Sequence, residues 1–303
     1  MKQKKPSSRL LSSAAEDLHN ATDPHGSEQS RSAAYRLAYD DLDFVLRDEL
    51  RPVRLLLELS KTELGLEDHG IDHTVVVFGS ARTLSPDQAN KLCEQAELEA
   101  AKSPTNELLK TVLKRAKTQM RYAGYYQQAQ KLGELIGQQS GHNNVLPVHV
   151  MTGGGPGIME AANRGASAAG ADTIGLNIVL PKEQKPNPYI TPDLCFRFHY
   201  FAMRKMHFLL RAKALVVFPG GYGTLDELLD TLTLMQTEKI KPMPILLFGR
   251  NYWQRLIDFD FLLEEGMIAE KDLQYFQYVD EAEEAWDIIK ESLSGITDHS
   301  ASP

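Results

Sequence analysis

Apolar and polar residues alternate along the chain in blocks that predict strands and helices in turn. The continuous apolar run Val75–Phe78 ends at Gly79, which is typical of a strand that is buried on both faces of a parallel sheet. Similar runs, most of them separated by amphipathic helical stretches, follow at residues 147–155, 171–181, 193–200, 214–218, 243–249 and 276–279. Repeated β-α units of this length predict an α/β fold with a doubly wound, Rossmann-like parallel sheet.

The ends of the chain do not follow this alternation. Residues 1–30 are polar with few large apolar side chains, which predicts a disordered tail. Across residues 31–70 apolar side chains recur at i, i+3, i+4 and i+8 from Leu42, so we expect N-terminal helices there. The Rossmann-like domain is then predicted to occupy residues 71–296, and residues 297–303 are predicted to form a loose tail.

The segment between the first two predicted strands is far longer than a single crossover needs. Three amphipathic helical stretches fill it, and the last, at 125–141, is interpreted as the crossover helix because Gly141 closes it. Residues of about 84–120 are therefore predicted to be a helical insertion. Either an oligomer contact or a lid would account for such an insertion, and the sequence leaves both open.

The composition of the chain limits the kinds of ligand, partner and cellular location that can be expected. The 303 residues carry a formal charge of −8, and an acidic balance disfavours nucleic-acid binding. The two cysteines, Cys93 and Cys195, stand in unrelated contexts, so neither a zinc site nor a disulfide framework is predicted, and a cytoplasmic location is expected. No apolar run approaches the ~20 residues that cross a bilayer, and the basic N-terminus lacks the apolar core of a secretion signal. No metal, cofactor or membrane partner is expected.

Three loops that contain glycine follow predicted strands, at 79–82, 153–157 and 219–223. Because right-handed crossovers bring the ends of parallel strands to one edge of a sheet, we expect the three loops to lie together where such folds bind ligands. Glycine amides and the N-terminus of the following helix attract anions. The pattern therefore predicts a ligand that carries phosphate, with Thr224 either capping the helix or contacting that phosphate.

The loops fit neither of two common nucleotide fingerprints. No G-x-x-x-x-G-K-[ST] motif is present, which disfavours a P-loop NTPase. The second loop breaks the G-x-G-x-x-G pattern because Ile158 stands at the third glycine position, and no evident ribose-binding acid follows ~20 residues later. A dinucleotide oxidoreductase is disfavoured for these reasons.

Two acids, Asp226 and Glu227, are predicted to lie in the first turn of the helix that follows the third loop. They can complement the positive end of a helix, and Thr224 and Glu227 also fit a capping box. A carboxylate beside a phosphate site otherwise repels the ligand, which favours a chemical task for one of the acids.

The helix predicted at 201–213 offers cations to this site. As a crossover it runs antiparallel to the strands, so its first turn lies at the same edge as the loops. Arg204 and Lys205 are therefore predicted to face the acids, with solvated surface charge as the alternative interpretation.

These motifs together resemble the Lonely Guy (LOG) family of phosphoribohydrolases. Residues 219–227, PGGYGTLDE, fit the family signature P-G-G-x-G-T-x-x-E, and residues 203–205 fit the M-R-K end of an upstream motif. The stretches VFGSAR and GGGPGIMEAANRGA resemble the first and second loops of the family, and the resemblance covers roughly residues 72–255. The N-terminal helices and the insertion resemble the longer bacterial-type members rather than the compact plant enzymes.

The resemblance implies an enzyme that hydrolyses the N-glycosidic bond of a nucleoside 5′-monophosphate to free base and ribose 5-phosphate. The base, whether AMP- or GMP-like or a cytokinin, stays open, and the family is at least dimeric. Glu227 would stabilise the positive charge that develops on the ribose and would orient the attacking water, while Arg204 would position the substrate. The implied substrate-binding residues are Ser80, Gly154, Gly155, Met203, Lys205, Gly220, Gly221, Gly223 and Thr224. A carrier protein that binds nucleotide on the same fold without turnover is the alternative.

Overall fold

The computed structural model describes residues 11–21, 26–139, 146–181 and 185–297. It divides into two compact units, Met1–Leu64 and Gly65–Pro303, and each is described by itself. Most of the predicted tails, residues 1–10, 22–25 and 298–303, lie outside the described residues.

The first unit is helical. Its elements are α1 (Ala14–Asn20), η1 (Ala33–Tyr35), α2 (Leu42–Val45), η2 (Asp48–Leu50) and the first part of α3 (Arg51–Asp68). Ser13 and Glu16 form a capping box at the start of α1, so the segment predicted to be a disordered tail contains one short helix. Pro52 stands in the first turn of α3, where a proline breaks no helical hydrogen bond.

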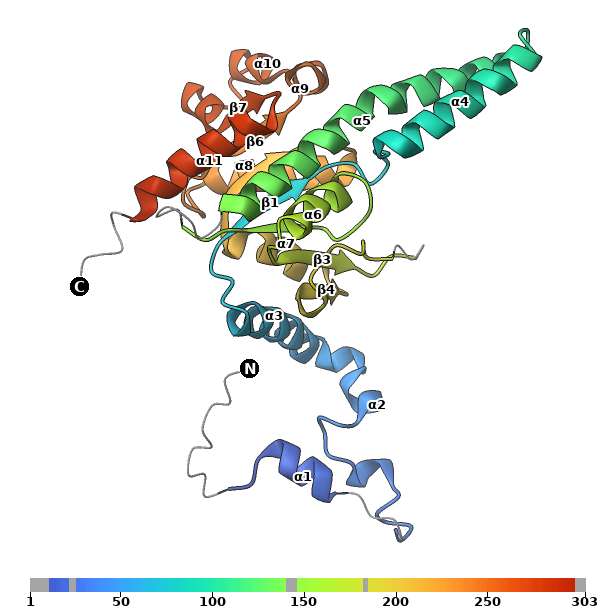
Figure 1. The fold of residues 1–303 in the computed structure, drawn as a ribbon. Coiled ribbons are helices and arrows are strands. Elements are labelled where there is room, and N and C mark those ends of the chain that lie inside the picture. Colours follow the sequence, from blue (N-terminus) through green and yellow to red (C-terminus); the bar gives the residue numbers. More distant parts are fainter. Residues whose placement is uncertain (1–10, 22–25, 140–145, 182–184, 298–303) are drawn as a thin grey trace. The chain divides into compact units, whose positions relative to one another are not determined.

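The second unit is built on a parallel sheet of seven strands in the order β4-β3-β2-β1-β5-β6-β7 (Figure 1). The strands are β1 (Thr74–Phe78), β2 (His149–Thr152), β3 (Thr173–Ile178), β4 (Cys195–Phe198), β5 (Ala212–Val217), β6 (Ile245–Phe248) and β7 (Phe276–Val279). The helices are α4 (Pro86–Lys102), α5 (Glu107–Gln139), α6 (Ile158–Ala168), α7 (Phe201–Leu210), α8 (Tyr222–Gln236), α9 (Arg250–Leu256), α10 (Phe259–Glu264) and α11 (Ala282–Thr297), with two short turns, η3 (Pro192–Leu194) and η4 (Glu270–Tyr275).

Alternate residues of the central strands β1, β5 and β6 belong to different hydrophobic cores, because successive side chains of a strand point to opposite faces. Val75 and Val77 of β1 pack into a core with α5, α6 and α11. Val76 and Phe78 of the same strand pack into a second core with α7, α8, α9 and α10. Helices therefore cover both faces of the sheet, which confirms the predicted doubly wound α/β fold.

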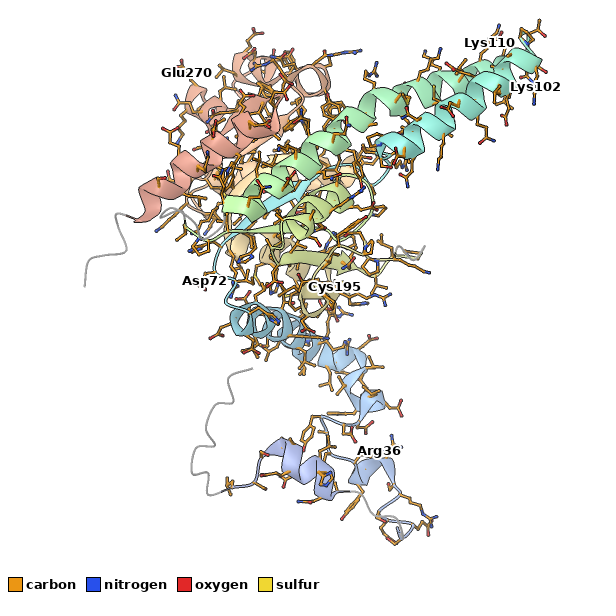
Figure 2. All side chains as sticks on the ribbon, viewed as in Figure 1. Arg36, Asp72, Lys102, Lys110, Cys195 and Glu270 are labelled. Atoms are coloured by element: carbon orange, nitrogen blue, oxygen red, sulfur yellow. The ribbon has the colours of Figure 1, made fainter. Side chains whose placement is uncertain are left out.

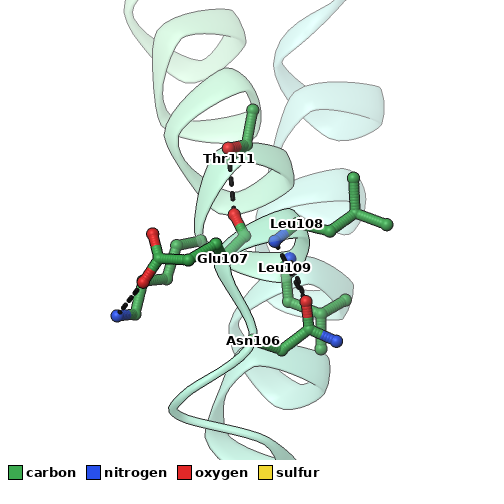
Figure 3. Close-up of polar contacts among 6 residues, drawn as sticks. Asn106, Glu107, Leu108, Leu109 and Thr111 are labelled. Atoms are coloured by element: carbon green, nitrogen blue, oxygen red, sulfur yellow. Dashed lines mark hydrogen bonds and ion pairs between the residues drawn. The ribbon is translucent and has the colours of Figure 1, made fainter.

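The helices α4 and α5 form a hairpin that extends beyond the sheet, with Lys102 and Lys110 at its far end (Figures 1 and 2). Ser85 caps α4 in a capping box with Gln88. At the turn, Asn106 Oδ1 accepts hydrogen bonds from the backbone N–H groups of Leu108 and Leu109, as Figure 3 shows. This asparagine starts α5 in the way an N-cap residue does.

The sequence pattern predicted one helix at the end of the insertion and a separate crossover helix after it. The structure instead has a single helix, α5, that runs without a break from Glu107 to Gln139. Its second half is buried against the sheet through Tyr126, Leu132 and Ile136. The second part of the predicted insertion is therefore a continuous extension of the crossover helix, whereas the first part forms the separate helix α4.

Two glycines of α5 are expected to respond in opposite ways to alanine. A Cβ at Gly133 would overlap the backbone oxygen of Ala162 in α6, whereas a Cβ at Gly124 would meet nothing within 4 Å. We therefore expect Gly133→Ala to destabilise the protein by about 1–3 kcal/mol. Gly124→Ala should stabilise it by about 0.5–1 kcal/mol, because alanine loses less backbone entropy in a helix. Urea unfolding of both variants checks this, and shifts of the same sign would contradict the close packing of α5 on α6.

Candidate active site

The candidate site lies where the strand order reverses, between β1 and β5. Connections from β1 to β4 proceed in one direction across the sheet, and β5 to β7 proceed in the other. The loops that leave β1 and β5 are joined by a hydrogen bond from the Ser80 N–H to the Pro219 carbonyl, 3.0 Å long. A cleft of about 750 Å³ opens at this point, which is where open α/β sheets bind ligands.

The third glycine loop leads straight into α8, which begins at Tyr222, before the Thr224 that the sequence offered as its N-cap. Gly221 is the N-cap and Tyr222 is the first helical residue, and no side chain caps this end. Thr224 is therefore inside the helix, so the predicted capping role and the capping box between Thr224 and Glu227 are wrong. Gly220 packs so tightly against the Thr224 side chain that a Cβ at position 220 would overlap its hydroxyl.

The early start of α8 places the two acids in the second turn, where the favourable field of the helix N-terminus has largely faded. Asp226 is exposed and its Oδ1 accepts a hydrogen bond from Lys205 Nζ at 2.8 Å. Glu227 is only 8% exposed and lines the cleft. Burial raises the pKa of Glu227 to about 7, against the opposing effect of the positive charges on Arg204 and Lys205. This carboxyl is therefore poised to exchange a proton near neutral pH.

Arg204 enters the cleft from α7 and is held by backbone oxygens. Its Nε donates to the Leu176 carbonyl at 2.7 Å, and one terminal nitrogen donates to the Gly153 carbonyl at 3.4 Å. The guanidinium also lies over the Phe208 ring, 5.1 Å from its centre. Burial lowers the pKa of Arg204 and the nearby Glu227 opposes that shift, but a guanidinium remains charged in proteins. The cleft thus contains a fixed positive charge.

The structure brings most of the predicted site residues together and separates the rest. The cleft is lined by these predicted residues: Ser80, Arg204, Gly220, Gly221, Gly223, Thr224 and Glu227. Four others, Gly154, Gly155, Met203 and Lys205, are outside its lining. The guanidinium of Arg204 and the carboxyl of Glu227, 23 positions apart in the chain, therefore face the same cavity as the glycine loop.

Each of the four remaining residues has another role in the structure. Lys205 does not line the cleft, and its Nζ pairs with Asp226, which does line it, and with Asp230, which does not. Met203 packs against the hydrophobic core beneath α7 and α8. The carbonyl oxygens of Gly154 and Gly155 accept hydrogen bonds from the backbone and side chain of Asn187, at 2.9 and 3.1 Å.

Sequence reasoning missed one wall of the cleft. Thr118, Gln119 and Tyr122 of α5 line it, as does Tyr252 of α9. Tyr252 donates a 2.6 Å hydrogen bond to the Gly220 carbonyl and so holds the third glycine loop in place. The sequence offered no signal for Thr118 and Gln119, because residues 84–120 were predicted to be an insertion with no visible relation to the loops.

The raised pKa of Glu227 predicts a stability effect that depends on pH. A folded-state pKa above the unfolded value favours the protonated carboxyl, so this contribution is full below about pH 4.5 and is lost as pH rises through 7. Glutamine mimics the protonated form. We expect Glu227→Gln to be more stable than the parent protein by about 2–3 kcal/mol at pH 8 and by much less at pH 5. Urea unfolding at both pH values measures this difference, and equal stabilities at pH 8 would contradict the burial argument.

Neither a metal-binding cluster nor a membrane-spanning helix is found among the described residues. Among them, no group of three or more His, Cys, Asp or Glu side chains is arranged to hold a metal ion. None of the helices in the described part of the chain combines the length and the apolar character that spanning a membrane requires.

Comparison with known proteins relates this chain to nucleotide hydrolases. A family described as "Possible lysine decarboxylase" matches residues 159–289. A cytokinin riboside 5′-monophosphate phosphoribohydrolase of Arabidopsis thaliana is 34% identical over 125 residues, which are 40% of this chain and 56% of that protein. A pyrimidine/purine nucleotide 5′-monophosphate nucleosidase of Escherichia coli is 28% identical over 139 residues, which are 41% of this chain and 28% of that protein.

The chain spans about half the length of the plant relatives it matches. Among solved structures, the molybdenum cofactor carrier protein of Chlamydomonas reinhardtii is similar at 21% identity and a TM-score of 0.38, over 56% of this chain and 88% of that one. The comparisons with curated proteins confirm the resemblance to the LOG family that the PGGYGTLDE motif predicted.

Proposed function

We propose that the chain hydrolyses the N-glycosidic bond of nucleoside 5′-monophosphates. The proposal is based on the sequence similarity to nucleotide hydrolases and on the residues that line the cleft. The observation that carries the proposal is that Arg204 and Glu227 line the same cavity as the glycine loop at 219–223. A phosphate site, a buried cation and a carboxyl with a pKa of about 7 are the groups that this reaction needs. Residues 71–296 are the proposed catalytic domain.

The phosphate is proposed to bind at the start of α8. The first N–H groups of a helix have no acceptor within the helix, and no side chain caps them here. With the positive end of the helix dipole they form an anion site, to which the Thr224 hydroxyl can add a hydrogen bond. Ser80 and Tyr252 hold the loop through the carbonyls of Pro219 and Gly220, so the site is already shaped in the free protein.

The sugar is proposed to lie between Arg204 and Glu227. As the bond from C1′ to the base nitrogen breaks, its electrons leave with the base and positive charge grows on the ribose. Ionised Glu227 stabilises that charge and takes a proton from the water that attacks C1′. Transfer of this proton to the departing base balances the hydrolysis and restores the carboxylate. The products are free base and ribose 5-phosphate. Arg204 lowers the pKa of Glu227 and so increases the fraction that is ionised at neutral pH.

The cations of the cleft fit hydrolysis better than the decarboxylation named in the family description. The two cations that line it in the described chain are Arg82 and Arg204. Pyridoxal phosphate requires a lysine amine that forms a Schiff base, and a guanidinium does not provide one.

Base release from nucleotides tests the proposal. The protein is incubated with AMP, GMP, CMP and a cytokinin riboside monophosphate, and free base and ribose 5-phosphate are separated by chromatography. We expect equal amounts of the two products from at least one of these substrates. Binding of the nucleotides with no base released from any of them would instead favour a carrier protein on the same fold.

The same proposal includes that the protein is a homo-oligomer and that it is located in the cytoplasm. The resemblance to the LOG family supports a homo-oligomer, and the scarcity of cysteine fits the reducing cytoplasm. Analytical ultracentrifugation of the purified chain measures the first, and a monomer at micromolar concentration would contradict it.

A further inference from the structure

The wall of the cleft formed by α5 contains a side chain that the proposed reaction does not use. Gln119 lines the cavity, and its Oε1 is buried without a hydrogen-bond partner among the described residues. A buried acceptor that lacks a donor costs free energy, so such atoms in native proteins usually have a ligand or water partner. Gln119 also carries the only side-chain amide among the described residues that line this cleft.

Aromatic rings flank this amide. Tyr122 lies on the same wall, three residues after Gln119 in α5. The centres of the Tyr122 and Tyr252 rings are 6.4 Å apart, and the two ring planes are at 88° to each other. Tyr252 in turn bonds Gly220 in the proposed phosphate loop. The α5 wall and the glycine loop are therefore parts of one continuous pocket, with apolar ring surface available to a flat ligand.

We infer that Gln119 and Tyr122 form the base subsite and that Gln119 selects a 6-aminopurine. The inference rests on the proposed nucleotide site: with phosphate at α8 and ribose at Arg204 and Glu227, the α5 wall remains for the base. A glutamine amide pairs with adenine through two hydrogen bonds, accepting from the N6 amine and donating to N7. The unpaired Oε1 is the acceptor that the N6 amine satisfies.

Hypoxanthine provides a sharp comparison, because it has a carbonyl oxygen where adenine has the N6 amine. That edge then offers two acceptors, and Oε1 of Gln119 stays unpaired. The two nucleotides AMP and IMP are otherwise nearly identical in shape and carry the same phosphate. A difference between them therefore reports on the base subsite alone.

The test measures the affinities for AMP and IMP by equilibrium titration. The Glu227→Gln background is used so that very little substrate is consumed during the titration, and Gln119→Leu is added to it. We expect the background protein to bind AMP about tenfold more tightly than IMP, and Gln119→Leu to reduce that preference to about twofold through weaker binding of AMP. The matched control is Gln127→Leu, the same substitution on the same helix at an exposed position outside the cleft, which should keep the preference.

An AMP preference that survives Gln119→Leu, or equal affinities in the background protein, would overturn the inference. The outcome is separable from that of the proposed function. Adenine-selective binding that depends on Gln119, with no base released by the parent protein, would refute the hydrolase and leave the base subsite standing. Base release without any preference for AMP over IMP would do the reverse.

Discussion

Glu227→Gln is expected to reduce base release from the best nucleoside monophosphate substrate by about a thousandfold. Glutamine keeps the size of the side chain but can neither carry the negative charge that stabilises the ribose cation nor accept a proton from water. Positioned acid-base groups contribute about 10²–10⁴-fold, and loss of electrostatic stabilisation at the ribose adds to this. The measurement is kcat, from free base separated by chromatography at pH 7.5.

Binding should behave differently from turnover in this variant. Because a buried carboxylate repels the substrate phosphate, its removal should leave nucleotide affinity unchanged or stronger. Asp230→Asn is the matched control, since Asp230 lies on the same helix, pairs with Lys205 and is outside the cleft. We expect that control to retain activity within about threefold. Activity of Glu227→Gln close to that of the parent protein would remove the central residue from the proposed mechanism.

Arg204→Met is expected to lower kcat/KM by at least about a hundredfold. The substitution removes the fixed charge of the cleft and its hydrogen bonds to Leu176 and Gly153. It should also move the pH profile. Base release needs ionised Glu227, so the rate falls as pH drops below about 7, and loss of the neighbouring positive charge raises the pKa of Glu227 further. The acid limb of the profile is therefore expected at higher pH in the variant.

The adjacent residue provides the control for this prediction. Lys205→Met removes the same charge one position along α7, but Lys205 is outside the cleft and bound to Asp226 and Asp230. We expect it to keep most of the activity, with a smaller shift of the pH profile than in Arg204→Met, because the Lys205 charge also lowers the pKa of Glu227. Equal losses in the two methionine variants would mean that the general charge of α7 matters and that the placement of Arg204 in the cleft does not.

Most of the sheet could be predicted because its strands are buried on both faces. Runs such as Val75–Phe78 contain almost no polar residue, and a glycine loop ends three of them. Parallel topology then places those loops at one edge, and Ser80 and Pro219 do meet there. The sequence thus predicted the edge of the sheet at which the candidate cleft lies.

The missed features depend on contacts between segments far apart in sequence. Thr224 looked like an N-cap, but α8 starts at Tyr222, directly after a loop whose carbonyls accept hydrogen bonds from Tyr252 and Ser80. Tertiary contacts override local capping preference in such cases. The α5 wall was missed for a related reason, because a helix pattern does not show which of its residues face a cleft on another element.

The unbroken course of α5 has a consequence for how the cavity can change shape. At 1.5 Å per residue the helix is about 50 Å long, and its core residues, from Tyr126 to Ile136, begin one turn after the wall at Gln119 and Tyr122. The wall is thereby rigidly attached to the sheet and cannot close over a bound nucleotide by a hinge motion. Entry and exit must depend on side-chain rotation or on the loops opposite. The distal turns of the hairpin, by contrast, can lengthen or shorten during evolution without disturbing the cavity.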